Sequence, residues 1–208
     1  IFAQWSTNPA SPQSLGSGVQ VQLAATSDGG VYVAWLSDGN NYHVLFQRLN
    51  SMGEPQWADN GMVVSNNANA SWIAVYHLNL AVDSEDNAII TTMDQRAGGA
   101  WEVYAYKIAS DGTMLWGDDG VSLTSSSVSN MSPRLTVLPD NSVVVTWTHN
   151  DDTVLFQRIS SDGTLLWDTG ILIEDDDATL ISPEPIVTND GNVSIQWIRQ
   201  TGPFWASN

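Results

Sequence analysis

The sequence contains no cysteine and few basic residues, and each absence excludes a class of protein. Without Cys among its 208 residues, the chain cannot form a disulfide scaffold, a thiolate metal site or a cysteine nucleophile. Six Lys and Arg stand against 23 Asp and Glu, which gives a formal net charge of -17. Because so acidic a chain repels phosphate backbones and anionic membranes, we expect no nucleic-acid partner.

Long hydrophobic runs are also missing. No uninterrupted stretch of apolar residues approaches the roughly 20 residues that a membrane-spanning helix needs, so we expect no membrane insertion. Hydrophobic residues still make up 42% of the chain, with ten Trp, and large aromatics fill the space between packed sheets. The opening Ile1-Phe2-Ala3 is typical of the end of a signal peptide cleaved after Ala3. We therefore predict a secreted protein, extracellular or on the outer cell surface.

One motif recurs along the whole chain. Each copy is a turn rich in Asp, Asn or Gly, followed by a largely β-branched run that ends in Trp or Met. The copies span Ser27 to Trp35, Ser84 to Met93, Pro139 to Trp147 and Asn189 to Trp197. This composition predicts a tight turn that leads into a strand, and a further strand precedes each turn.

A second motif follows the first three copies. Strand-like blocks at 44–49, 103–108 and 154–159 each lead into a tight turn and then a Trp, and a last short strand closes each unit. Asp-Gly turns such as Asp162-Gly163 are typical of hairpins. Each unit of about 50 residues therefore holds four short strands, which is the size and strand count of a propeller blade.

The predicted fold is all-β, a β-propeller-like array of four-stranded antiparallel blades. Both faces of the first repeated strand are apolar, with Val33 and Trp35 on one face and Tyr32 and Ala34 on the other. Such a strand is buried on both sides, as a blade is between its neighbours. The fourth unit departs from this rule with Ser194 and Gln196, which indicates a wetter gap or a different neighbour.

The repeat also predicts the blade boundaries within one domain over residues 1–208. Because residues 4–8 resemble residues 56–60, Trp5 precedes Trp57 by one repeat. The chain is then the N-terminal part of a larger propeller, and the rest of a longer chain is a predicted partner. A closed four-bladed propeller is the alternative. The expected units are 1–11 (the outer strand of a closing blade), 12–70 (blade 1), 71–130 (blade 2), 131–180 (blade 3) and 181–208 (partial blade 4).

The pattern resembles the tandem β-propeller repeats of proteins secreted by Bacteroidota-type bacteria. In those repeats an Asp-Gly turn, an apolar strand and a Trp are followed by a Gln-Arg-Leu strand, a second Asp-Gly turn and another Trp. Here these elements match Asp28 to Trp35, Gln47 to Leu49, and Trp57 to Val64. Unit two departs, with Met93 expected at the Trp position and Lys107 at the Arg position. The resemblance implies a propeller fold and export, and it names no ligand.

Several residues recur at one place in the repeat, and we interpret them as structural. For the basic residues among them, a ring of ligand-binding cations is the alternative to one ion pair or hydrogen bond per blade. We favour the second interpretation, because repeated positions in repeat folds usually serve packing. The structural repeat positions are Trp5, Trp35, Trp57, Trp116, Trp147, Trp167, Trp197, Arg48, Lys107 and Arg158.

Other aromatic and acidic residues are candidates for binding. Exposed aromatic side chains stack on sugars and anchor protein partners, although they also cap neighbouring blades. The candidates of this kind, which lie off the repeated core positions, are Trp72, Trp101, Tyr42 and Trp205. The run Asp175-Asp176-Asp177 offers oxygen ligands for Ca²⁺, with a solvated loop as the alternative. No other cofactor is expected.

Three functions are consistent with this sequence. The first is a non-catalytic binding or structural module outside the cell that contacts protein or glycan. The second is a glycoside hydrolase or lyase with paired carboxylates on the blade loops. The third is a component or passenger of a bacterial secretion or adhesion assembly. We favour the first and expect no catalytic residues, although the fold alone does not decide, because propellers host many functions.

Overall fold

The computed structural model describes residues 10, 12–38, 42–67, 78–96, 98–124 and 127–202. Within these ranges the elements of regular structure are strands, and no helix there is long and apolar enough to cross a membrane. The strands are β1 (Gly18–Ala25), β2 (Val31–Ser37), β3 (Val44–Leu49), β4 (Met62–Ser65), β5 (Asn79–Val82), β6 (Ala88–Asp94), β7 (Glu102–Ile108), β8 (Val121–Ser122), β9 (Asn130–Val137), β10 (Val143–His149), β11 (Thr153–Ile159), β12 (Ile171–Ile173), β13 (Thr179–Val187) and β14 (Val193–Gln200).

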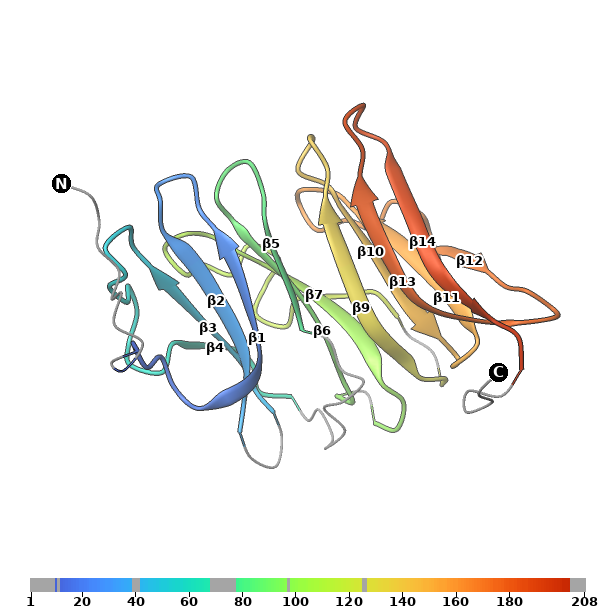
Figure 1. Ribbon diagram of the computed structural model, residues 1–208, viewed down its shortest axis with the longest axis horizontal. Coiled ribbons are helices and arrows are strands. Elements are labelled where there is room, and N and C mark those ends of the chain that lie inside the picture. The colour runs from blue at the N-terminus through green and yellow to red at the C-terminus, as the bar shows by residue number, and fades with distance from the viewer. Residues whose placement is uncertain are drawn as a thin grey trace.

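The strands pair in chain order into antiparallel sheets, which confirms the all-β, propeller-like fold. Blade 1 is β1–β4, blade 2 is β5–β8, blade 3 is β9–β12, and blade 4 consists of β13 and β14 in the described part of the chain. The first strands of successive blades lie side by side, β1 next to β5, β5 next to β9 and β9 next to β13. Figure 1 shows the blades as a row in chain order.

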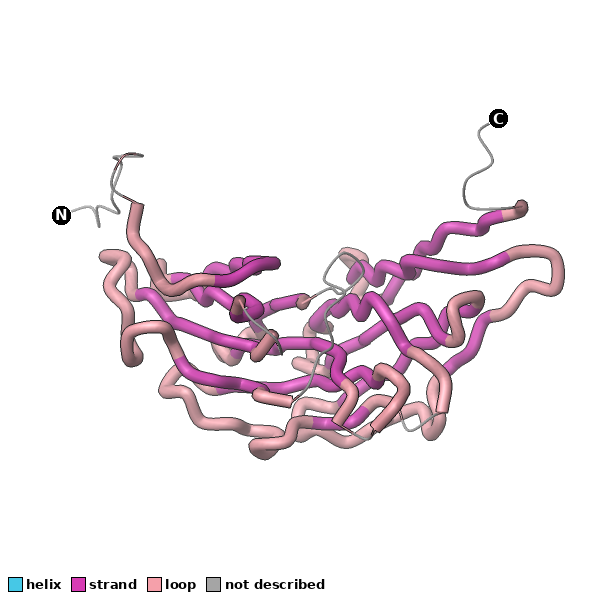
Figure 2. Tube along the Cα trace, turned by 90° about the horizontal axis from the view of Figure 1, so that it is seen from below, coloured by secondary structure: helices cyan, strands magenta, loops and turns pink. Residues whose placement is uncertain are grey.

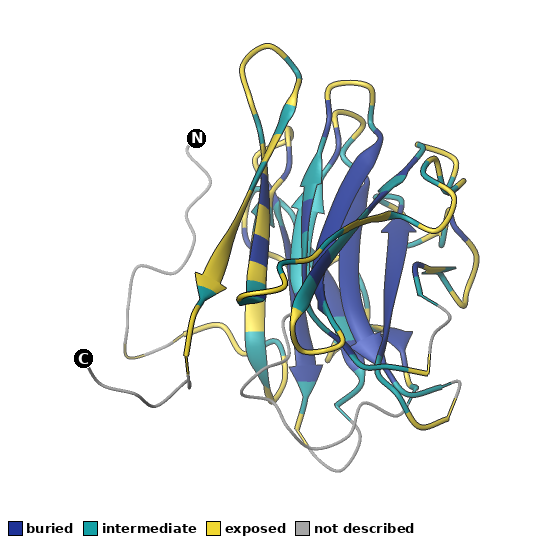
Figure 3. Ribbon diagram, turned by 90° about the vertical axis from the view of Figure 1, so that its right-hand side faces the viewer, coloured by how far each residue is buried: buried dark blue, intermediate teal, exposed yellow. Residues whose placement is uncertain are grey.

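The row of blades is curved and open. In both Figure 1 and Figure 2, blade 1 and blade 4 lie at opposite ends of the row. The described residues therefore form an open array and not the closed four-bladed ring that was the alternative. Seen from the blade 4 end, β14 is exposed over most of its length, while β13 beside it is partly buried and β10 of blade 3 is almost fully buried (Figure 3).

Apolar side chains fill the gaps between blades. Tyr32 and Phe46 of blade 1 pack with Ile90 and Tyr106 of blade 2 in one cluster. A second cluster joins blades 2 and 3 around the fully buried Trp147. Because both faces of β2, β6 and β10 are covered, these strands are largely apolar and lack the alternation of a half-exposed strand.

The register corrects one sequence expectation, because Met93 does not replace the repeated Trp. In blade 1 Trp35 lies opposite Leu45, whereas in blade 2 it is Thr92 that lies opposite Tyr104. Successive side chains of a strand point to opposite faces. Met93 therefore lies on the other face of β6, where it is 1% exposed.

The repeated basic residues tie each third strand to the turn before the second strand of the same blade. Arg48 also donates to the Ser110 carbonyl at 3.1 Å, and Lys107 to the Ser161 carbonyl at 3.2 Å, so both reach the next blade. The ion pairs are Arg48–Asp28 at 2.6 Å, Lys107–Asp83 at 2.9 Å and Arg158–Asp140 at 2.7 Å.

The repeated tryptophans occupy several environments. Trp35 and Trp147 are buried, and Trp116 is nearly so. Trp57 packs on Phe46 with ring centroids 5.2 Å apart, and Trp167 meets Phe156 edge-on at 6.0 Å. Trp197 of blade 4 is 39% exposed. Trp5 lies outside the described residues.

The first strands of blades 1, 3 and 4 are interrupted at one place. Gln20, Ser132 and Ser182 have φ of 54°, 57° and 53°, and the register with the second strand shifts at each of these points. These are β-bulges, which twist a strand and redirect its side chains. The bulges place polar residues between the first strands of neighbouring blades.

Candidate ligand-binding pocket between blades 2 and 3

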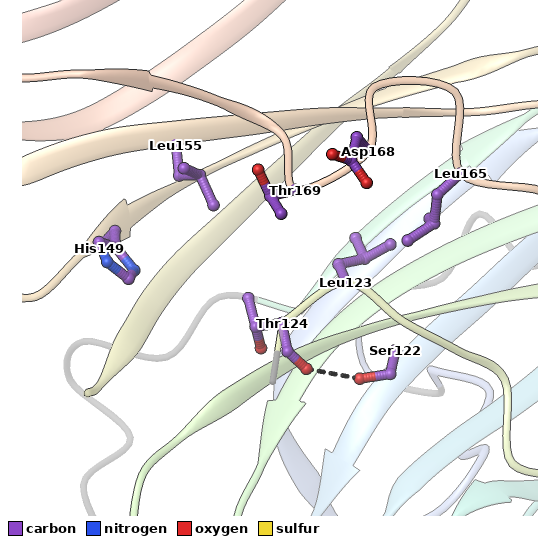
Figure 4. Close-up of a pocket in the computed structure, with 8 residues that line it drawn as sticks. All are labelled: Ser122, Leu123, Thr124, His149, Leu155, Leu165, Asp168 and Thr169. Atoms are coloured by element: carbon purple, nitrogen blue, oxygen red, sulfur yellow. Dashed lines mark hydrogen bonds between the residues drawn. The ribbon is translucent and has the colours of Figure 1, made fainter. Parts of the chain in front are cut away.

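A pocket of about 290 Å³ lies between the outer strand of blade 2 and the middle strands of blade 3. Blade 2 contributes the end of β8, and blade 3 contributes the end of β10, part of β11 and the turn that follows β11. Figure 4 shows these side chains converging from the two blades. The lining residues are Ser122, Leu123, Thr124, His149, Leu155, Leu165, Asp168 and Thr169.

His149 is held in the pocket wall by the fully buried Asn130. The Asn130 side-chain oxygen lies 2.7 Å from His149 Nδ1 and accepts from Trp147 Nε1 at 2.9 Å. The amide nitrogen of Asn130 donates to the carbonyls of Trp101 at 3.2 Å and Val128 at 3.0 Å. Because its nitrogen faces two acceptors and its oxygen faces an indole N–H, the orientation of the Asn130 amide is fixed.

This arrangement fixes the tautomer of His149. An amide oxygen only accepts, so His149 Nδ1 must carry the proton, which leaves Nε2 as an acceptor. Burial lowers the pKa of His149 below its usual 6.5, and the nearby Asp152 carboxylate opposes that shift in part. The imidazole is therefore neutral at pH 7, and its Nε2 lone pair is available for hydrogen bonding.

Asp168 and Thr169 sit on a turn that Gln157 fastens to β11. Gln157 donates to the Asp168 carbonyl at 3.1 Å and accepts from the Trp167 backbone N–H at 3.0 Å. Asp168 has φ of 47°, a conformation that Asp and Asn adopt more readily than other non-glycine residues. The buried Gln157 thus presents the Asp168 and Thr169 side chains at the pocket's edge.

The pocket contains two groups that only accept and several hydroxyl groups. The Asp168 carboxylate and His149 Nε2 can only accept, whereas the Thr124 hydroxyl accepts from the Val103 backbone N–H at 3.0 Å and keeps its own O–H for donation. Leu123, Leu155 and Leu165 form an apolar wall. A complementary ligand must therefore supply donors together with an apolar face, as a polyol or a sugar does.

The two aromatic candidates that the structure describes, Tyr42 and Trp101, do not line this pocket. Tyr42 is half-buried and packs against the core between blades 1 and 2. Trp101 is half-buried, and its carbonyl accepts from the backbone N–H of Asn130 at 2.9 Å. Trp72 and Trp205 lie outside the described residues.

The acidic run at the blade 3 to blade 4 connection is tied to blade 4. Asp175 accepts from Arg199 Nε at 2.6 Å and from Arg199 Nη2 at 3.0 Å, and also from the backbone N–H of Asp177 at 3.0 Å. In the described part of the chain, Asp175, Asp176 and Asp177 belong to no group of three or more acidic or His side chains placed to hold a metal ion.

A second polar cluster, which we call the acidic pair, lies on blade 2. Asp94 and Glu102 face each other across β6 and β7, and they are 2% and 6% exposed. Arg96 donates to both oxygens of Asp94, at 3.0 and 2.7 Å, and its guanidinium lies 3.6 Å from the Tyr104 ring centroid. Tyr104 donates to Glu102 at 3.1 Å.

Burial and charge shift the pKa values around the acidic pair. The pKa of Tyr104 is raised to about 12, first by burial and then by the negative charge of Asp94. Burial acts to lower the pKa of Arg96, but hydrogen bonds to Asp94 and Tyr106 outweigh it, so the pKa rises. Arg96 is therefore a permanent cation whose donors are occupied by Asp94, Tyr106 and the Asp119 carbonyl.

Sequence reasoning missed the pocket, because His149 was not singled out as a candidate residue. One signal was present: the second strand of each blade ends in a polar residue at the same repeat position, Ser37, Asp94, His149 and Arg199 in turn. No sequence pattern marked Asp168 as a site residue, because the residues across the pocket from it belong to blade 2.

Comparisons with known proteins assign this chain to no family. No family model matches the chain, and no curated protein matches it. Among solved structures, it is similar to an endo-arabinase from Bacteroides thetaiotaomicron, with a TM-score of 0.48 and 12% sequence identity. That alignment covers 93% of this chain and 78% of the endo-arabinase chain.

Proposed function

We propose that this protein is a non-catalytic, extracellular or cell-surface binding module that recognises the hydroxyl groups of a glycan at the pocket between blades 2 and 3. The carrying observation is the fixed tautomer of His149, which presents Nε2 as an acceptor in the pocket that the Asp168 carboxylate also lines. Hydroxyl groups of a sugar can donate to both, while the leucine wall covers the ring's apolar face.

The state of the carboxylates supports binding over hydrolysis. Of the pocket-lining residues, Asp168 is the one carboxylic acid, whereas glycoside hydrolysis needs two across the scissile bond. Several other aspartates, among them Asp28, Asp140 and Asp162, have lowered pKa values because hydroxyl groups in their own turns hydrogen-bond to them. A general acid needs a raised pKa.

The test is a screen of neutral oligosaccharides, followed by calorimetry on the hits with pocket variants. Asp168→Asn keeps a residue that tolerates positive φ and removes the charge, and Thr169→Trp fills the pocket sterically. Asp118→Asn, in the corresponding turn of blade 2, is the charge-matched control. We expect both pocket variants to weaken binding and the control to leave it unchanged. Equal affinity in all three would exclude the pocket.

A glycoside hydrolase is the second candidate, and the acidic pair is the observation that favours it. Directly opposite residues on antiparallel strands have Cβ atoms roughly 5 Å apart, which brings two carboxyl groups near each other, and glycoside hydrolysis uses such a pair. Hydrolysis of a polysaccharide panel, lost in Glu102→Gln, would establish this function. A folded Glu102→Gln variant with unchanged activity would exclude it.

A further inference from the structure

Arg134 differs from every other basic residue of the chain. Of six Lys and Arg residues, five form ion pairs with aspartates at 2.6 to 2.9 Å. Within the described ranges Arg134 forms no ion pair, and its hydrogen bond goes to the carbonyl of the adjacent Pro133 at 3.3 Å. In a chain with a net charge of -17, a cation without a carboxylate partner is unexpected.

Arg134 lies in a small cavity between the first strands of blades 3 and 4. This inner cavity has a volume of about 90 Å³ and is lined by Ser132, Arg134, Ser182, Pro183 and Glu184. Burial lowers the pKa of Arg134, and Glu184 opposes the shift. Because a guanidinium stays protonated in proteins, the cavity contains a partly desolvated positive charge.

Comparison with the junction between blades 2 and 3 explains why Arg134 forms no hydrogen bond to the described part of blade 4. Four residues before the first turn of blade 2, Asn79 accepts a hydrogen bond from the backbone N–H of Leu135 in blade 3, at 3.0 Å. Arg134 occupies the same position relative to the turn of blade 3, and Pro185 occupies the Leu135 position in blade 4. Proline has no N–H and arginine has no acceptor. Both partners of this inter-blade bond are therefore replaced at the next junction.

The remaining contacts of the cavity leave Arg134 accessible. Thr148 accepts from the backbone N–H of Ser182 at 3.1 Å, and Thr146 donates to the Pro183 carbonyl at 3.1 Å, so β10 holds blade 4 without Arg134. Glu184 accepts from Gln196 Nε2 at 3.3 Å within blade 4. Glu184 is exposed and remains able to accept another donor.

From this arrangement we infer that the inner cavity binds the carboxylate group of a hydroxylated acid, such as a uronic acid. Arg134 binds the carboxylate through its paired N–H donors, which match that geometry. Glu184 accepts a hydroxyl group next to the carboxylate. Because the cavity holds one carboxylate and not a whole sugar ring, the remainder of the ligand extends out of it.

The experiment is an NMR titration of the full chain with sodium glucuronate, glucose and sodium acetate as probes. Glucuronate should shift the backbone amides of Leu135 and Glu184, and glucose should not. Arg134→Gln should weaken glucuronate binding by at least about tenfold, which is the loss expected when a charged hydrogen-bond donor is removed. Arg199→Gln, a basic residue on β14 of blade 4, is the matched control and should bind as the unmodified chain does.

Three results would overturn this inference. They are undiminished glucuronate binding in Arg134→Gln, equal shifts of Leu135 and Glu184 with glucose, and shifts confined to Asp168 and Thr169. Glu184→Gln removes a like charge, so it should strengthen acetate binding, and weaker acetate binding would contradict the geometry. If Arg134→Gln does not fold, Arg134→Lys keeps the charge but loses the paired donors, and it should lower glucuronate affinity.

Discussion

Lys107 Nζ lies 2.9 Å from Asp83 Oδ2 with both side chains almost fully buried, whereas the equivalent Arg158 of blade 3 pairs near the surface with Asp140, which lies two positions further along its turn. The exposed fractions are 5% and 0% for the first pair, and 29% and 60% for the second. One basic position of the repeat thus forms an ion pair in two environments, and burial should decide how much each pair contributes to stability.

Replacing the cation of each pair by methionine tests this difference. Lys107→Met leaves the buried Asp83 carboxylate without its charge partner, and the free energy of unfolding should fall by about 3–5 kcal/mol. Arg158→Met should cost at most about 1 kcal/mol, because the pair is exposed to solvent. Urea denaturation of the two variants checks the prediction, and equal losses would contradict it.

Stability should also decrease in acid, because the first-turn aspartates are hydrogen-bonded in the folded state. The pKa values of Asp28 and Asp140 are lowered from 3.8, first by the hydroxyl groups of Thr26 and Ser142. For Asp83, burial acts to raise the pKa, but hydrogen bonds from Asn87 and Lys107 outweigh it. A depressed folded-state pKa stabilises the protein above the unfolded pKa, and this contribution is lost as the pH falls through the folded value.

The aspartate contribution to the free energy of unfolding should therefore be fully present above about pH 5 and decrease below it, as the pH passes through the unfolded aspartate pKa of about 3.9. Urea denaturation at several pH values measures this. Thr26→Val removes the hydroxyl that bonds to Asp28 and should reduce the pH dependence. A free energy independent of pH down to about pH 2.5 would contradict the assignment.

Asn130 should be among the most sensitive residues of the core. Asn130→Leu removes the acceptor for Trp147 and His149 and the donor for two carbonyls, all in a site with no solvent access. Each buried polar group left unpaired costs about 1–3 kcal/mol, so the total loss should exceed 2 kcal/mol. Asn192→Ala, on the exposed turn of blade 4, is the control and should stay within about 0.5 kcal/mol.

The tautomer of His149 is directly measurable. Long-range proton–nitrogen NMR should show protonated Nδ1 and unprotonated Nε2 at pH 7, and a pKa below 6.5, the direction that burial imposes. Because the folded pKa is lowered, the unfolded chain takes up this proton first as the pH falls, so His149 protonation destabilises the fold below about pH 6.5. Glycan affinity should decrease as the folded His149 protonates, and a protonated Nε2 at pH 7 would exclude the proposed acceptor.

The fold was predictable from the sequence because its repeat sets both the strands and the turns. The blocks 44–49 and 154–159 fall on β3 and β11, and the short strand expected to close the third unit is β12. The misplacement of Met93 has a physical cause, since an apolar run gives no sign of which residue faces which blade when both faces are buried.

The candidate sites were less predictable, because they arise between blades. Asn130 forms hydrogen bonds with residues as far apart in the sequence as Trp101 and His149, and no local motif predicts these bonds. Nothing in the local sequence distinguishes Arg134. It becomes distinctive once the first strands of the blades are aligned by counting back from the turn that follows each strand. The Asn79 to Leu135 hydrogen bond is then seen to lack a counterpart at the next junction.

That missing counterpart can be engineered. The double variant Arg134→Asn with Pro185→Leu recreates an acceptor in blade 3 and an N–H donor in blade 4, as Asn79 and Leu135 have them. A net intramolecular hydrogen bond contributes about 0.5–1.5 kcal/mol, so the double variant should be more stable than the sum of the single changes by about that amount. Urea denaturation of the four proteins in this cycle gives the coupling energy. Because the same variant removes the guanidinium, it should no longer bind glucuronate. A double variant that gained stability and still bound glucuronate would support the inter-blade hydrogen bond and exclude Arg134 as the carboxylate site.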